Sequence, residues 1–293
     1  MQFRYSVPMR HSHIFARLRL LLIGLHLLSG AFQLALLFLH GGSTGRRRLK
    51  RAWSRQLLAL LGIRIDSDLG DRIRIEGGLL VANHISFIDI FVINALLPSG
   101  FVAKSDVAQW PLIGWLARHA DTVFIERGSR KAAHSTRQQM LAALGAGQRL
   151  AIFPEGTTTS GDRVLPFHAA LFQSAIDAAV PVHALALSYR GSDGARCGAP
   201  AYIDEISVIG CLISVLEAGG LVARIELAAS FAPPLADRRH LAHHARQAVV
   251  TALAQAPDAV PAPRCRDIDP PKRRENPLPG PAQPLRNEAA MRQ

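Results

Sequence analysis

Short apolar runs alternate with longer amphipathic stretches through the middle of the chain. Seven runs of three to seven residues are rich in aliphatic and β-branched side chains, which is typical of strands. These runs are Ile73–Glu76, Leu79–Ala82, Phe101–Ala103, Thr122–Ile125, Leu150–Phe153, Val182–Ser188 and Val222–Ala228. The stretches with a helical period are Arg47–Gly62, Phe87–Leu96, Ala108–Arg118, Ser129–Leu144, His168–Ala178 and Arg238–Ala254. This alternation predicts an α/β domain built on a mixed sheet with flanking helices.

The N-terminal segment has a different pattern. An almost unbroken apolar run extends from Leu20 to Leu39, and as a helix of about 1.5 Å per residue it would be about 30 Å long. Residues 1–55 hold ten Lys and Arg and no Asp or Glu, so basic flanks surround this run. We expect a membrane-associated helix at about 20–39 within a basic N-terminal region, 1–45. A membrane-spanning and an interfacial placement both stay open, and a cleaved signal peptide or a buried core helix are the alternatives.

Charge and composition divide the rest of the chain. The net charge is +12, yet residues 56–255 hold seventeen Lys and Arg and seventeen Asp and Glu, which argues against a nucleic-acid-binding body. We expect one globular domain over 46–255. Nine of the eighteen prolines follow residue 256, so 256–293 is predicted to be a disordered tail. The three cysteines are widely separated and predict neither disulfides nor a thiolate metal site, which fits a reducing, cytoplasm-facing environment.

A histidine and a carboxylate stand five residues apart just after one predicted strand, at His84 and Asp89. On a continuous helix two such side chains would diverge by about 140°, so His84 must lie in the loop before the helix. Ser86 fits as the N-cap, which lets Asp89 in the first turn point back toward the imidazole. An imidazole oriented by a carboxylate can act as a general base near neutral pH. The alternative is a capping box, in which Asp89 only accepts a bond from a free backbone N–H. Backbone N–H groups near Ser86 are also candidate oxyanion donors.

Two further strands end in polar residues. Val123–Ile125 leads to Arg127, whose guanidinium suits a phosphate or, alternatively, a surface salt bridge. Leu150–Phe153 leads to Glu155, Gly156 and Thr157, a segment that fits a polar binding loop or a plain turn.

In order, four segments resemble the motifs of the glycerolipid (lysophospholipid) acyltransferase family. They are Asn83-His84 with Asp89 (NHxxxxD), Phe124-Ile125-Glu126-Arg127 (FIxR), Phe153-Pro154-Glu155-Gly156-Thr157 (FPEGT) and Val180-Pro181-Val182 (VPV). Ala103-Lys104 adds to the similarity. The resemblance implies transfer of a fatty acyl group from acyl-CoA or acyl-carrier protein to a hydroxyl of a membrane lysolipid, with no cofactor and no metal, at the cytoplasmic side of the inner membrane.

The resemblance also implies a role for each matching residue. His84 would be the base and Asp89 would hold it, while Arg127 and Lys104 would bind the acceptor phosphate. Glu155, Gly156 and Thr157 would shape the acceptor site.

Two departures concern the acceptor. Family members that act on lysophosphatidate often carry Arg and Lys where this chain has Thr158 and His168. The sequence therefore predicts an acyltransferase of the lysophosphatidate type, with lyso-ornithine lipid as the alternative acceptor. A non-catalytic lipid-binding membrane protein is the alternative from another functional class.

Overall fold

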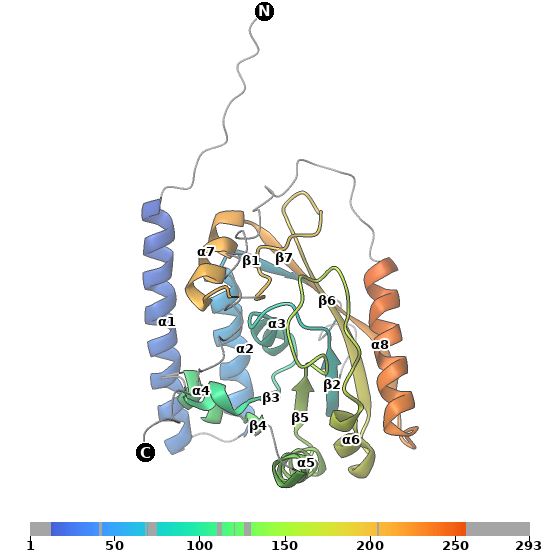
Figure 1. The fold of residues 1–293 in the computed structure, drawn as a ribbon. Coiled ribbons are helices and arrows are strands. Elements are labelled where there is room, and N and C mark those ends of the chain that lie inside the picture. Colours follow the sequence, from blue (N-terminus) through green and yellow to red (C-terminus); the bar gives the residue numbers. More distant parts are fainter. Residues whose placement is uncertain are drawn as a thin grey trace, which may run out of the picture.

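The computed structural model describes residues 13–40, 43–67, 69, 75–109, 113–119, 121–125, 130–203 and 205–255 (Figure 1). Arg127 and the predicted disordered tail, 256–293, lie outside these residues.

A seven-stranded sheet forms the centre of the described fold. Its strand order is β1-β7-β6-β2-β5-β3-β4. Only β6 and β7 pair antiparallel, and every other neighbouring pair is parallel. The predicted mixed sheet is therefore confirmed. The strands are β1 (Ile63–Asp66), β2 (Gly78–Ala82), β3 (Gly100–Lys104), β4 (Val123–Ile125), β5 (Arg149–Ile152), β6 (Val182–Arg190) and β7 (Leu221–Phe231).

Helices cover both faces of the sheet because its central strands are apolar on both sides. In β2, Leu80 and Ala82 pack in one buried cluster, whereas Leu79 and Val81 pack in the other. The first cluster includes residues of α2 (Ser43–Leu60), α3 (Asp89–Leu96) and α7 (Val208–Ala218). The second includes residues of α5 (Arg130–Gly145), α6 (Gln173–Asp177) and α8 (Arg238–Gln255). The result is a three-layer α/β/α arrangement (Figure 1).

Several predicted elements differ from the observed ones. Strand β1 and helix α7 were not predicted, while Ile75 and Glu76 of the predicted strand at 73–76 are not in a strand. The predicted helix at 108–118 is replaced by a 3₁₀-helix, η1 (Ser105–Gln109), and by α4 (Ile113–His119). The one at 168–178 divides into a 3₁₀-helix, η2 (Ala169–Phe172), and α6. Helix α7 had a readable signal, since the Ser207 hydroxyl caps it by accepting from the N–H of Gly210 and Gly219 ends it.

The N-terminal helix α1 (His13–His40) packs against α2 (Figure 1). The His26 and Trp53 rings stack with their centroids 4.9 Å apart, and the Trp53 indole N–H donates to the His26 carbonyl at 3.1 Å. Gly30 makes this close approach possible, because a Cβ there would collide with the Trp53 ring. Among the described residues, no helix has the combined length and apolarity needed to cross a bilayer. A membrane-crossing helix at 20–39 is therefore not supported.

Candidate active site

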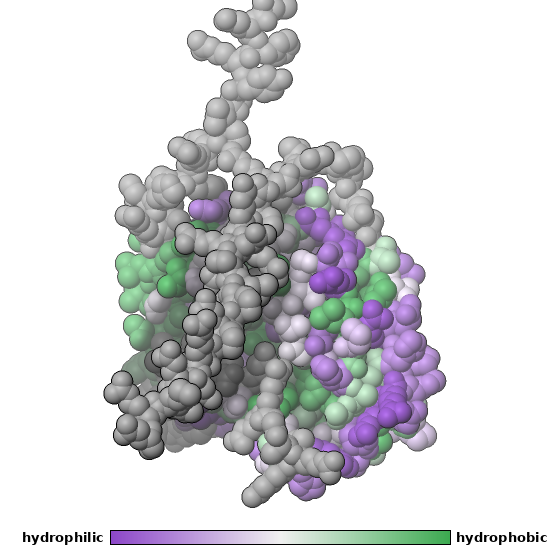
Figure 2. Space-filling view, in the orientation of Figure 1, coloured by the Kyte–Doolittle hydropathy of each residue, from purple (hydrophilic) through white to green (hydrophobic). Residues whose placement is uncertain are grey.

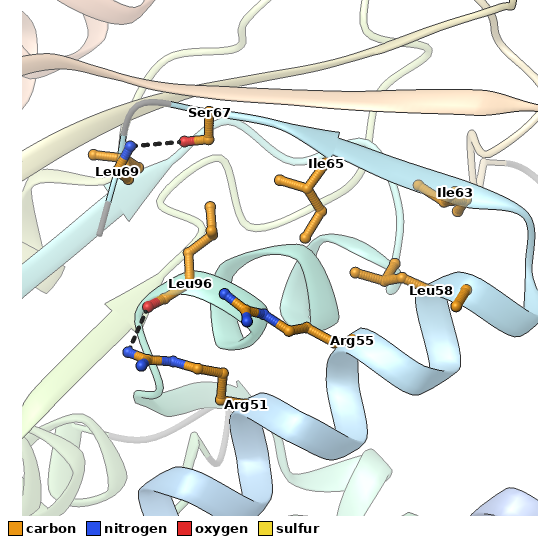
Figure 3. A pocket seen from close by; sticks show the side chains of 9 residues that line it. Arg51, Arg55, Leu58, Ile63, Ile65, Ser67, Leu69 and Leu96 are labelled. Carbon is orange, nitrogen blue, oxygen red and sulfur yellow. Dashed lines mark hydrogen bonds between the residues drawn. The ribbon is translucent and has the colours of Figure 1, made fainter. Parts of the chain in front are cut away.

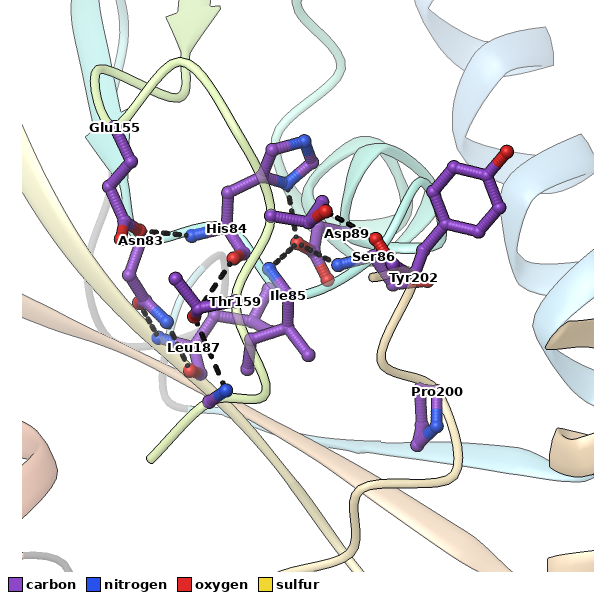
Figure 4. Close-up of polar contacts among 12 residues, drawn as sticks. Asn83, His84, Ile85, Ser86, Asp89, Glu155, Thr159, Leu187, Pro200 and Tyr202 are labelled. Carbon is purple, nitrogen blue, oxygen red and sulfur yellow. Dashed lines mark hydrogen bonds and ion pairs between the residues drawn. The ribbon is translucent and has the colours of Figure 1, made fainter. Parts of the chain in front are cut away.

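His84 and Asp89 meet where the central strand β2 passes into α3. His84 follows the strand by two residues, and Asp89 is the first residue of the helix. The Nδ1 atom of His84 lies 2.9 Å from Oδ2 of Asp89 (Figure 4). An ionised carboxylate only accepts hydrogen bonds, so Nδ1 carries the proton and Nε2 is the basic nitrogen of the neutral ring. The His84 side chain is 18% exposed and the Asp89 side chain is fully buried, so the imidazole is the member of the pair that solvent or a substrate can reach.

The buried carboxylate of Asp89 accepts four hydrogen bonds. Its Oδ2 atom accepts from His84 Nδ1 and from the backbone N–H groups of Ile85 at 2.7 Å and Ser86 at 2.9 Å. Its Oδ1 atom accepts from the Tyr189 hydroxyl at 2.7 Å. The two interpretations of Asp89 are thus compatible, because one carboxylate both orients the imidazole and satisfies free N–H groups ahead of the helix.

The start of α3 differs from the prediction. The N-cap residue is Ile88, which makes no side-chain capping bond, and Phe87 and Ile88 form a turn instead of the first helical turn. The N–H groups of Ile85 and Ser86 both point at Asp89. The expectation that N–H groups around Ser86 serve as oxyanion donors is therefore wrong for these two groups, because the carboxylate already occupies them.

Glu155 binds the main chain on either side of the site. Its Oε1 accepts from the His84 N–H at 2.7 Å, and its Oε2 accepts from the Leu165 N–H at 2.7 Å. The side chain is buried, and burial raises the pKa of Glu155 above its ordinary value, although the two N–H donors oppose this rise. The Thr159 N–H donates to the His84 carbonyl at 2.9 Å. Both main-chain polar groups of His84 are therefore held by the loop that follows β5.

The imidazole is also held by an aromatic ring. Phe153 stacks on His84 with a centroid separation of 3.9 Å and an interplanar angle of 7°. On the other side of the strand end, the Asn83 side chain forms two hydrogen bonds with the main chain of Leu187, at 2.9 and 2.8 Å. Because Asn83 directly precedes His84, this pair continues the contact between β2 and β6 up to the histidine.

The structure brings together some of the predicted site residues and leaves others undescribed. His84, Asp89 and Glu155 converge, and Gly156 and Thr157 continue the same loop. Gly156 has φ of 71°, and an added Cβ would lie 3.2 Å from the His168 ring, so a glycine suits this turn. Thr157 is exposed. Lys104 lies at the end of β3, but its side chain is outside the described part of the structure, as is all of Arg127.

Three residues that hold the site in place were not predicted as site residues from the sequence. Tyr189 and Asn83 act across 100 or more residues of chain, and Phe153 was assigned only to a strand. Asn83 and Phe153 adjoin recognised motif residues, which was a usable signal. Nothing in the local pattern around Tyr189 distinguishes it from an ordinary core residue of β6.

A separate cavity of about 380 Å³ lies between α2, β1 and the C-terminal end of α3 (Figure 3). Its lining combines aliphatic residues with Arg51 and Arg55 and includes Leu96, the last residue of α3. Asp89 is at the opposite end of that helix. The described residues of this lining include no His, Asp or Glu, so none of them is a candidate general base.

Within the described residues, no group of three or more His, Cys, Asp or Glu side chains is arranged to hold a metal ion.

Comparison with known proteins gives consistent results. Residues 66–188 match the family model named Acyltransferase. A 1-acyl-sn-glycerol-3-phosphate acyltransferase of Neisseria meningitidis is 38% identical over 186 residues, 64% of this chain and 72% of that protein. A lyso-ornithine lipid O-acyltransferase of Pseudomonas aeruginosa is 38% identical over 208 residues, 71% of this chain and 79% of that protein.

The fold is also found among solved structures. The crystal structure of the 1-acyl-sn-glycerophosphate (LPA) acyltransferase PlsC from Thermotoga maritima is similar to this chain with a TM-score of 0.59 and 20% sequence identity. The similarity covers 82% of this chain and 96% of that one.

Proposed function

We propose that this chain, which belongs to the acyltransferase family, transfers a fatty acyl group from a thioester donor to a hydroxyl of a lysolipid. The observation that carries the proposal is the 2.9 Å contact between His84 Nδ1 and Asp89 Oδ2 at the end of the central strand. A thioester is already activated, so one well-positioned general base is sufficient chemistry for the transfer.

In the proposed reaction, Nε2 of His84 removes the proton from the acceptor hydroxyl. The oxygen attacks the thioester carbonyl, a new ester C–O bond forms, and the C–S bond breaks to release the thiol, which takes up the proton. Asp89 stabilises the imidazolium that forms in between and keeps the ring in the tautomer with Nε2 unprotonated. Neither a cofactor nor a metal has a step in this scheme.

The donor and the headgroup of the acceptor are finer parts of the same proposal. Acyl-CoA and acyl-carrier protein both supply a thioester. We propose that Arg127 and Lys104 hold the acceptor phosphate when lysophosphatidate is the substrate. Lyso-ornithine lipid is the second candidate, because Thr158 and His168 stand where cations would favour a phosphomonoester and the Thr158 hydroxyl donates to the carbonyl of Tyr202.

The test of the activity is turnover with a panel of lysolipids that includes lysophosphatidate and lyso-ornithine lipid, each with acyl-CoA and with acyl-carrier protein. We expect His84→Ala to abolish turnover and to keep the wild-type far-UV circular dichroism spectrum. Retained turnover in this variant would contradict the assignment of the base. Binding of lysolipid without turnover across all donors would favour a non-catalytic lipid-binding protein.

We also propose that α1 associates with the inner membrane from its cytoplasmic side. Six large apolar side chains of this helix are 40–66% exposed: Leu18, Leu21, Leu22, Leu25, Leu28 and Phe32. Hydrophobic residues gather on this flank of the molecule, whereas the opposite flank, at α8, is mainly hydrophilic (Figure 2). A helix with one exposed apolar face and basic neighbours suits the interface of an anionic bilayer.

Vesicle flotation tests this placement. The double variant with Leu21→Asp and Leu25→Asp should bind phosphatidylglycerol vesicles at least about ten times more weakly, because each exposed leucine that loses the apolar phase costs about 1.5 kcal/mol or more. Thr251→Asp, on the exposed surface of α8, is the matched charge control and should bind like the wild type. Equal binding of all three proteins would rule out α1 as the membrane contact.

A further inference from the structure

Tyr189 is a buried polar residue whose hydroxyl reaches the catalytic pair from a distant part of the chain. It lies near the end of β6, is 2% exposed, and is separated from Asp89 by 100 residues of sequence. Its hydroxyl donates to Oδ1 of Asp89 at 2.7 Å, while Oδ2 of the same carboxylate binds His84 Nδ1. The tyrosine thus holds the carboxylate oxygen that the imidazole does not use.

We propose that Tyr189 is a positioning residue that acts through Asp89, fixing the plane of its carboxylate and setting the pH at which His84 takes up a proton. This inference rests on the proposed role of His84 as the base. The family resemblance assigns no role to this tyrosine, which lies outside all four motifs.

The surroundings of the Asp89 carboxylate define what the hydroxyl does. Burial and the neighbouring negative charge raise the pKa of Tyr189 well above its ordinary value, so the phenol stays protonated and remains a donor. Besides His84, the titratable described groups near Asp89 are Cys211 of α7 and Glu155. Burial raises the pKa of Cys211 to about 11, so this thiol is neutral over the working range of pH. Tyr189 is therefore a neutral donor that spreads the carboxylate charge in a dry environment.

Removal of this donor has a predictable direction. Without the hydroxyl, Oδ1 becomes a buried acceptor with no partner, and the negative charge concentrates on the oxygen that faces the imidazole. The His84–Asp89 pair then takes up a proton more readily, whichever of the two groups carries it. The acid limb of the activity profile should move to higher pH. The freed carboxylate can also rotate, which weakens the orientation of His84.

Tyr189→Phe is the test, because it removes one oxygen and keeps the ring that packs in the core. Tyr202→Phe is the matched control: Tyr202 is half-buried, its ring lies edge-on to Phe87, and its hydroxyl points away from Asp89 (Figure 4). We expect Tyr189→Phe to lower kcat by roughly ten-fold. This is the low end of the loss seen when a residue that orients an active-site group is removed. The midpoint of its acid limb should rise by roughly 0.5 pH unit or more, and KM for the lysolipid should change little. Tyr202→Phe should match the wild type in all three quantities.

A titration that needs no turnover separates this inference from the proposed function. The His84 ring resonance is identified in a histidine-labelled sample by its loss in His84→Ala, and its midpoint is measured by NMR in the wild type and in Tyr189→Phe. A higher midpoint in Tyr189→Phe supports the coupling even if no acceptor is turned over, in which case only the proposed function fails. Equal midpoints in the two proteins overturn the role of Tyr189, whatever the activity assays show. A rise in KM with an unchanged pH profile overturns it as well.

Discussion

Glu155→Gln distinguishes two roles for the glutamate that follows β5. The sequence predicts a residue that shapes the acceptor site, whereas in the structure both carboxylate oxygens accept backbone N–H groups, from His84 and Leu165, at 2.7 Å each. A glutamine offers one acceptor oxygen, and its NH₂ group must face the other N–H donor. One charge-assisted hydrogen bond is then lost at a cost of about 1.5–3 kcal/mol.

An opposing effect reduces this cost. Burial raises the pKa of Glu155, which means that the ionised carboxylate is destabilised in the folded protein. A neutral glutamine amide does not carry this penalty. The net loss of unfolding free energy at neutral pH should be about 1–3 kcal/mol. Because the folded pKa lies above the unfolded value, wild-type stability falls as pH rises from about 4.5 through the folded pKa of Glu155. Glu155→Gln lacks this dependence, so the difference between the two proteins should shrink over that window.

The assay combines denaturant unfolding at several pH values with steady-state kinetics. If Glu155 only holds the main chain, Glu155→Gln should have lower stability and a lower kcat, with KM for the lysolipid nearly unchanged. The reason is that the His84 main chain loses a hydrogen bond that fixes it. Glu217→Gln, an exposed residue of α7, is the matched control and should behave like the wild type. If Glu155→Gln is as stable as the wild type and has a raised KM, Glu155 does not act by holding the main chain. That result would favour direct contact between Glu155 and the acceptor.

Three other substitutions test the surrounding contacts. Asp89→Asn should lower kcat by roughly 10²- to 10⁴-fold because the imidazole loses its orienting carboxylate, and a stability loss of about 1 kcal/mol with activity spared would instead indicate capping alone. Asn83→Ala should lower the unfolding free energy, measured in urea, by roughly 2–4 kcal/mol, because it leaves the buried N–H and carbonyl of Leu187 without these hydrogen bonds. An unchanged urea midpoint would contradict this pairing. Phe153→Leu should lower kcat about three- to ten-fold, since stacking on His84 contributes about 0.5–1.5 kcal/mol, and unaltered kinetics would show that the stack does not hold the ring.

The sheet was largely predictable because its central strands are buried on both faces. Such strands read as continuous apolar runs, and the predicted runs at 79–82, 101–103, 122–125, 150–153, 182–188 and 222–228 each overlap an observed strand. The short edge strand β1, Ile63–Asp66, alternates apolar and charged residues over only four positions, too few to show a period. Helix α7, Val208–Ala218, is a short and almost wholly apolar run, and periodicity alone does not separate such a run from a buried strand.

The reactive pair could be predicted because its members are close in sequence, and a turn of five residues limits where two side chains can lie. The contacts that hold this pair could not be predicted, although Glu155 itself was predicted as a site residue. Each of these contacts joins residues that are 71 or more positions apart in the sequence: those made by Glu155, by Tyr189 and by the Leu187 main chain. Only the parallel pairing of β2 with β5 and β6 brings these groups together, at the carboxyl ends of the three strands.

This arrangement also limits where the transition state can be stabilised. The N–H groups of His84, Ile85 and Ser86 all donate to carboxylates, so none of the three can donate to the thioester oxygen as negative charge develops on it. What the loop gains instead is rigidity: the same two carboxylates that occupy its N–H groups, Asp89 and Glu155, fix the ring and the main chain of His84. Loss of either carboxylate should therefore act on the rate through the placement of the base, which is why kcat, and not affinity for the lysolipid, is the quantity that each of these substitutions should change.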